Sequence, residues 1–101
     1  MKIHIPFLPE FRDAMLGGRK RATARAKRYG TAGDTFEAFG ATFRLTLVER
    51  VRLMEVTRNW QWEGCESEGE FMSIWSRLHP TGWHADKKVW WHWFERRSDD
   101  K

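Results

Sequence analysis

The feature that most constrains the fold of this chain is the alternation of apolar and polar residues over 42–47. Phe43, Leu45 and Leu47 alternate with three polar residues, and this period of two predicts a strand with one buried face. Residues 48–56 continue with mixed β-branched and charged side chains, which favours one long, strongly curved strand or a hairpin-like pair after a bulge or bend. We therefore expect the chain to fold around a sheet.

Shorter elements precede this strand. Alternation over 2–6 predicts a first short strand, and Pro9 suits the first turn of a helix over 8–16. Gly17-Gly18 then ends that helix in the manner of C-cap glycines. A further alternation begins at Thr35 and stops at Gly40, which indicates another strand.

The C-terminal third predicts one helix and one strand. Ser67 and Glu70 match a capping box, so a second helix is expected over 68–78, before Pro80. Its apolar stripe has i, i+3, i+4, i+7 spacing and comprises Phe71, Ile74, Trp75 and Leu78. Residues 89–94 form a strand with bulky side chains on both faces. The predicted class is α+β with two helices and a mainly antiparallel sheet, whose closure into a small barrel would protect its edges.

Length and composition bound the remaining possibilities. The 101 residues suit one domain, predicted over 1–97 with a polar tail over 98–101, and 15% aromatic content makes a stable core feasible. Cys65 is the single cysteine, which excludes an internal disulfide and a structural Cys-based zinc site. No apolar run is long enough to cross a bilayer, and we expect a soluble, cytoplasmic, monomeric protein.

The charge distribution points to anionic partners. The formal net charge is +4, which modestly favours nucleic acid, nucleotides or an acidic metabolite. A soluble basic protein without such a partner is the alternative. The cations concentrate in one run without acidic residues: Arg19, Lys20, Arg21, Arg25, Lys27 and Arg28.

Lys20 and Thr23 are the first candidates for chemistry. A hydroxyl becomes a nucleophile when a base takes its proton, and a lysine is such a base only if its pKa is depressed, which neighbouring arginines favour. Residues three apart on a strand face opposite sides, so the two side chains converge only if Lys20 lies in the turn after Gly17-Gly18. A solvated basic strand is the alternative.

Glu63 is the third candidate, because the flanking Trp60 and Trp62 could shield its carboxylate from water. It could equally be a surface acid near a helix start, and the two indoles could be core residues or a platform for a flat base. His79 and His84 could belong to a metal site or be solvated loop histidines, and their spacing does not define a metal motif.

Two blocks of the sequence resemble the ASCH domain family. Gly18, Lys20, Thr23 and Arg25 are similar to its GxKxxTxR signature, and Trp62-Glu63-Gly64-Cys65-Glu66-Ser67 with the following helix is similar to its second block. The resemblance spans about 3–95. It implies a PUA-like β-barrel, a fold associated with RNA and modified-nucleoside recognition, with a cleft lined by both blocks.

The smallest stand-alone bacterial members of the family include amidohydrolases that remove the acyl group from N4-acetylcytidine and related N4-acylated pyrimidines. The resemblance implies that Thr23 is the nucleophile, Lys20 the base and later acid, and Glu63 the residue that orients Lys20 or the substrate amide. It implies no metal or organic cofactor. Arg25 would hold the ribose, the base carbonyl or the oxyanion, and Arg19, Trp60 and Trp62 are further candidate substrate contacts.

Two other readings remain open. The basic run and exposed indoles could form an RNA-binding module, or a ribonuclease in which Lys20 or a histidine does acid–base work. The tryptophan-rich strand and the density of cations leave room for RNA. Alternatively, the indoles could form the interface of a protein-interaction module.

Overall fold

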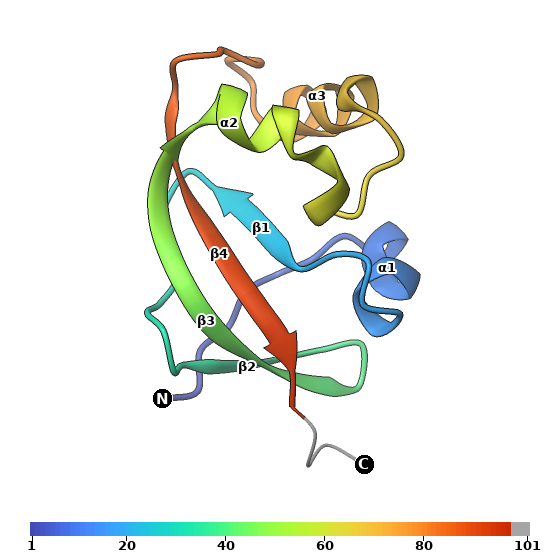
Figure 1. Ribbon diagram of the computed structural model, residues 1–101, viewed down its shortest axis with the longest axis vertical. Coiled ribbons are helices and arrows are strands. Elements are labelled where there is room, and N and C mark those ends of the chain that lie inside the picture. Colours follow the sequence, from blue (N-terminus) through green and yellow to red (C-terminus); the bar gives the residue numbers. More distant parts are fainter. Residues whose placement is uncertain (98–101) are drawn as a thin grey trace.

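The computed structural model describes residues 1–97. Its four strands form a curled antiparallel sheet, and helices lie at one end and along one side of this sheet (Figure 1). The strand order is β1-β4-β3-β2. The elements are a 3-10 turn Pro9–Phe11, α1 Arg12–Leu16, β1 Ala22–Arg25, β2 Thr35–Ala38, β3 Ala41–Arg52, α2 Leu53–Arg58, a second 3-10 turn Trp60–Trp62, α3 Glu68–Leu78 and β4 Lys88–Arg96. The predicted α+β class is confirmed, and the sheet is a half-barrel that ends at β1 and β2 rather than a closed barrel.

β3 departs from its predicted course in two ways. A bulge shifts its register against β4 between Leu45 and Leu47, so the expected bend is present. The prediction that the strand continues to residue 56 is wrong, because α2 begins at Leu53. Leu53, Val56 and Thr57 are buried, and this helical spacing places all three against the core. Burial of that face outweighs the strand preference of β-branched residues.

The N-terminal segment forms less strand and as much helix as expected. Of the predicted strand over 2–6, only Lys2 makes a bridge, parallel to Thr35. The predicted helix over 8–16 is a 3-10 turn that continues into α1. Gly18 follows with a φ of 81°, the left-handed conformation that a glycine after a helix end adopts without strain.

α3 has the predicted limits. The Ser67 hydroxyl accepts a hydrogen bond from the Glu70 N–H at 3.0 Å, and the Glu70 carboxylate accepts one from the Glu66 N–H. Both bonds satisfy amides at the helix start that have no partner within the helix. Phe71 and Trp75 are the buried residues of this helix, so its apolar stripe faces the sheet as expected.

Two apolar clusters share the sheet. One lies under α2 and α3 and includes Trp91, and the other, at the end that holds β2, includes Phe36, Phe43 and Phe94. β4 contributes to both, since Trp91 and Phe94 lie on opposite faces of the strand, as its bulky sequence predicts. No helix among residues 1–97 is long and apolar enough to cross a membrane. The predicted polar tail over 98–101 lies outside the described residues.

Candidate active site

Lys20 lies in the turn between α1 and β1, with its side chain buried. Its backbone N–H donates to the Ala14 carbonyl at the end of α1, and Lys20 forms an isolated antiparallel bridge with Glu63. The ammonium donates to the Ala22 carbonyl at 3.0 Å, the Glu63 carbonyl at 2.9 Å and Glu63 Oε1 at 3.1 Å. The placement in the turn is the one that convergence with Thr23 requires.

The Lys20–Glu63 ion pair is almost fully buried. Lys20 is 3% exposed and Glu63 5% exposed, and Trp91 Nε1 donates to the second carboxylate oxygen of Glu63 at 2.8 Å. Burial lowers the pKa of Lys20, and the neighbouring Glu63 opposes part of that effect. The neutral amine is therefore reached at lower pH than in an exposed lysine, which a catalytic base needs.

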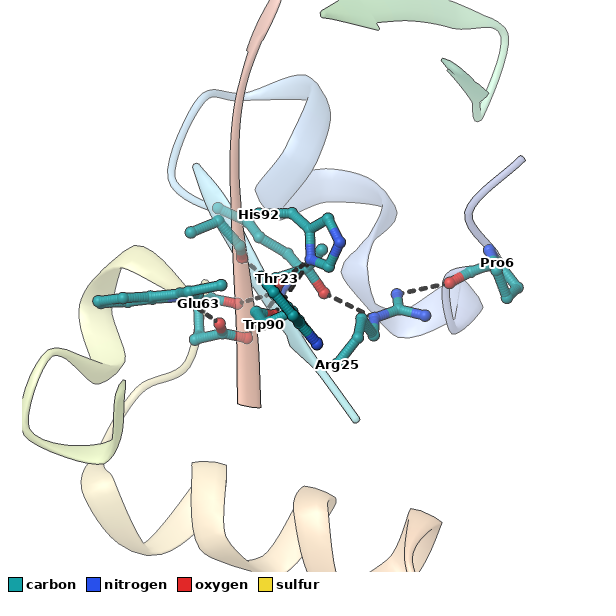
Figure 2. Close-up of polar contacts among 9 residues, drawn as sticks. Pro6, Thr23, Arg25, Glu63, Trp90 and His92 are labelled. Carbon is teal, nitrogen blue, oxygen red and sulfur yellow. Dashed lines mark hydrogen bonds and ion pairs between the residues drawn. The ribbon is translucent and has the colours of Figure 1, made fainter. Parts of the chain in front are cut away.

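Thr23 and Arg25 lie on the same face of β1, as their spacing predicts. Thr23 is buried, and its hydroxyl oxygen accepts a hydrogen bond from Arg25 Nε at 3.0 Å. Arg25 Nη2 also donates to the Pro6 carbonyl at 2.6 Å, so the guanidinium bridges β1 and the N-terminal segment (Figure 2). A cationic donor at the hydroxyl stabilises negative charge that develops on that oxygen.

His92 fixes the backbone at Thr23 from the neighbouring strand. Its Nε2 accepts from the Tyr29 N–H at 3.0 Å, which assigns the ring proton to Nδ1. Nδ1 then donates to the carbonyls of Thr23 and Trp90, at 3.2 and 3.1 Å (Figure 2). The ring is fully buried, and it holds the backbone at Thr23 from β4.

These side chains meet in a cleft at the free edge of β1. Lys20, Thr23, Arg25 and Glu63 all line it, and its volume of about 560 Å³ is in the range of small-molecule sites. Its other walls come from the segment before α1, the segment after β1 and α3; they include Phe7, Phe11, Lys27, Tyr29, Phe71, Ile74, Trp75, Leu78 and His79.

Cys65 also lines the cleft, but it is not an activated nucleophile. Burial, with the nearby Glu63, raises the pKa of the thiol to about 12. A thiol reacts as its thiolate, so Cys65 stays in its unreactive form near neutral pH. The hydroxyl of Thr23, with a cationic donor beside it, is the better-prepared nucleophile of the two.

The remaining predicted contacts lie away from this cleft. Arg19 is exposed and pairs with Glu66 at 3.4 Å. Trp62 is 37% exposed and lines two other hollows, near Trp93, while Trp60 packs against the apolar cluster under α2 and α3. The structure thus unites Lys20, Thr23, Glu63 and Arg25 and places the other three candidates elsewhere.

The histidines considered for metal binding have protein partners. His79 Nδ1 lies 3.0 Å from the Trp75 carbonyl, with its ring stacked on Trp75 at 3.8 Å. His84 Nε2 lies 2.7 Å from the Thr81 carbonyl. Within residues 1–97, no three His, Cys, Asp or Glu side chains are grouped so that they could hold a metal ion.

Sequence reasoning missed Trp91 and His92 as parts of the site. The alternation over 89–94 correctly placed them on opposite faces of one strand. Their partners, Glu63 and Thr23, are 28 and 69 residues away in the chain, so only the strand pairing brings them together. The sequence signal for His92 was a single histidine among the otherwise apolar residues 89–94.

The arrangement of this sheet and its helices is an ASCH-like fold. A solved ASCH domain from Lactobacillus crispatus JV V101 superposes with a TM-score of 0.65 at 12% identity, covering 94% of this chain and 78% of that one. The hypothetical protein PH0355 gives a TM-score of 0.74 at 16% identity, covering 96% and 100%. Protein EF3133 from Enterococcus faecalis V583, described under DUF984, gives 0.63 at 21% identity, covering 87% and 67%. No protein-family model and no curated protein matches the chain.

Proposed function

We propose that this protein is an amidohydrolase that removes the acyl group from N4-acetylcytidine or a related N4-acylated cytosine or cytidine. The observation that carries the proposal is the convergence of four residues in one cleft. A buried Lys20–Glu63 pair and an Arg25-bonded Thr23 hydroxyl line the same hollow. A base of lowered pKa, a hydroxyl and a fixed cationic donor are the parts that acyl transfer needs.

In the first half-reaction, Lys20 acts as the neutral amine that its burial favours, and Glu63 orients it through their 3.1 Å hydrogen bond. Since its ammonium has three acceptors, one of them must be released before Nζ can face Thr23. The Thr23 oxygen then bonds to the amide carbonyl carbon while Lys20 takes the hydroxyl proton. Lys20 returns that proton to the exocyclic nitrogen as the C–N bond breaks, which leaves an acyl-threonine ester and free cytidine.

In the second half-reaction, water attacks the ester carbon and gives a proton to Lys20. The bond from the acyl carbon to the Thr23 oxygen breaks, and that oxygen recovers the proton as the carboxylic acid leaves. Arg25 stabilises the charge on the Thr23 oxygen in both halves through its 3.0 Å bond. In this scheme, the chain's own side chains make every proton transfer.

The test is release of cytidine and acetate from N4-acetylcytidine by purified protein. Thr23→Val removes the hydroxyl at nearly constant size and is expected to lower kcat by about a thousandfold or more. Thr46→Val is the matched control, because Thr46 is an exposed threonine on β3, and it should retain wild-type turnover. Lys20→Arg should also be inactive, because it keeps the buried positive charge but cannot supply a neutral base.

Equal turnover by Thr23→Val and Thr46→Val would show that Thr23 is not the nucleophile. Absence of cytidine release, together with oligonucleotide binding that weakens steeply as salt rises, would favour an RNA-binding module instead. A neutral nucleoside substrate predicts a Michaelis constant that changes little with ionic strength. Ionic strength therefore separates the two functions.

A further inference from the structure

A single face of α3 forms an apolar wall of the cleft. Phe71, Ile74, Trp75 and Leu78 line the cleft at i, i+3, i+4, i+7 spacing, so they form one stripe along the helix. Phe71 and Trp75 are each 4% exposed, whereas Leu78 is 50% exposed. The stripe therefore runs from the buried interior to solvent, over about 10 Å at 1.5 Å per residue.

Another part of the cleft is cationic and aromatic. Arg25, Lys27 and Tyr29 line it after Thr23, and Arg25 and Lys27 lie over the Tyr29 ring at 5.5 and 4.8 Å. A cytosine carbonyl and ribose hydroxyls need hydrogen-bond partners when they leave water. The nucleoside half of a substrate is therefore better matched to this part than to the α3 stripe.

This division of polarity assigns the two halves of the substrate. The scissile amide must lie at Thr23 and Lys20, which line the same cleft. With the nucleoside toward Arg25 and Lys27, the acyl group extends toward α3. An acetyl group has one methyl carbon and would cover little of a stripe that spans two helical turns.

We propose that the acyl group preferred by this enzyme is large and apolar, a medium-chain or aromatic acyl group that lies along the α3 stripe. The inference rests on the proposed amidohydrolase function and specifies its substrate class. The chemistry is unchanged: Thr23 bonds to the acyl carbon, the C–N4 bond breaks, and water releases a longer or aromatic carboxylic acid. Selectivity comes from apolar surface that the acyl chain removes from water.

The experiment compares kcat/KM for N4-acetyl-, N4-hexanoyl- and N4-benzoylcytidine with the full chain. Each buried methylene contributes up to about a fourfold gain, so the hexanoyl and benzoyl substrates should exceed acetyl by about tenfold or more. Leu78→Ser should lower the hexanoyl-to-acetyl ratio several-fold. Leu47→Ser is a matched control, since Leu47 is 49% exposed against 50% for Leu78 and lies on β3, and its ratio should equal that of wild type.

Acetyl turnover equal to or faster than hexanoyl and benzoyl turnover would overturn the inference and leave the amidohydrolase in place. A hexanoyl-to-acetyl ratio that Leu78→Ser and Leu47→Ser change equally would also overturn it, because the α3 stripe would not be the cause. Failure to hydrolyse any of the three substrates would instead remove the proposed function, and the inference with it. The outcomes are therefore distinguishable within one set of assays.

Discussion

At the scale of single residues, His92 shows how a buried polar group supports the site. Its Nε2 accepts a hydrogen bond from the Tyr29 N–H, and its Nδ1 donates to the Thr23 and Trp90 carbonyls. Burial lowers the pKa of His92, and the charges of Arg25 and Arg28 lower it further. The hydrogen bonds to the two carbonyls oppose this effect. The neutral ring thus connects β1, β4 and the segment after β1.

His92 predicts a loss of stability at mildly acidic pH. Its folded pKa is below the unfolded value of about 6.5, so the unfolded chain binds the proton more readily. The stability contribution is complete above about pH 6.5 and is lost as pH falls through the folded pKa. Urea unfolding of wild type and His92→Asn between about pH 7.5 and pH 5 measures this.

The His92→Asn variant should show a shallower decline of unfolding free energy with falling pH than wild type, whatever its absolute stability. Identical slopes for wild type and His92→Asn would show that His92 does not titrate differently on folding.

At the scale of elements, the bulge in β3 decides which face each of its residues presents. Leu45 pairs with Phe94 and Leu47 with Trp93, so the two leucines oppose consecutive residues of β4. A slip of one residue moves a side chain to the other face. Accordingly, Leu45 is 1% exposed and Leu47 is 49% exposed, although the sequence alternation assigns both to the buried face.

This difference gives a paired prediction for stability. Leu45→Ser should cost about 3 kcal/mol or more of unfolding free energy, because it removes a buried side chain and introduces a hydroxyl into the apolar cluster. Leu47→Ser should change it by about 0.5 kcal/mol or less. Chemical denaturation of both variants measures the two values, and similar losses would contradict the placement of the bulge.

At the scale of the whole molecule, Gly64 marks where distant segments meet. Its φ is 82°, and a Cβ there would lie 2.8 Å from the Lys20 Cβ and 3.1 Å from the Ala14 Cβ. α1, the turn that holds Lys20 and the segment after Glu63 therefore pack at the closest distance that a glycine permits. The geometry of the Lys20–Glu63 pair depends on that approach.

Gly64→Ala should therefore be more damaging than a glycine substitution elsewhere. Gly33 has a φ of 98° and open space around its Cβ position, so Gly33→Ala costs only the left-handed backbone, about 1–2 kcal/mol. Gly64→Ala adds the clash with Lys20, and should both destabilise the fold further and reduce turnover. Thermal unfolding and N4-acetylcytidine turnover of both variants test this, and equal effects would contradict close packing at Gly64.

The sequence by itself determined the elements whose causes are local. α3 has its predicted limits because Ser67 and Glu70 satisfy its first amides and Pro80 follows its end, and β1 carries Thr23 and Arg25 on one face because strand residues alternate. The class of fold followed from the order of such elements. Each of these causes acts within a few residues of the chain.

Only the tertiary structure decided which distant residues meet. Lys20 and Glu63 are 43 residues apart, and their pairing depends on Gly64, on the turn after α1 and on Trp91 from β4. α2 replaced a predicted strand, and the bulge exposed Leu47, because burial against the assembled core outweighs local preference. The sequence could name the candidate residues, but their hydrogen bonds depend on how β1, β4 and the Glu63 segment come together.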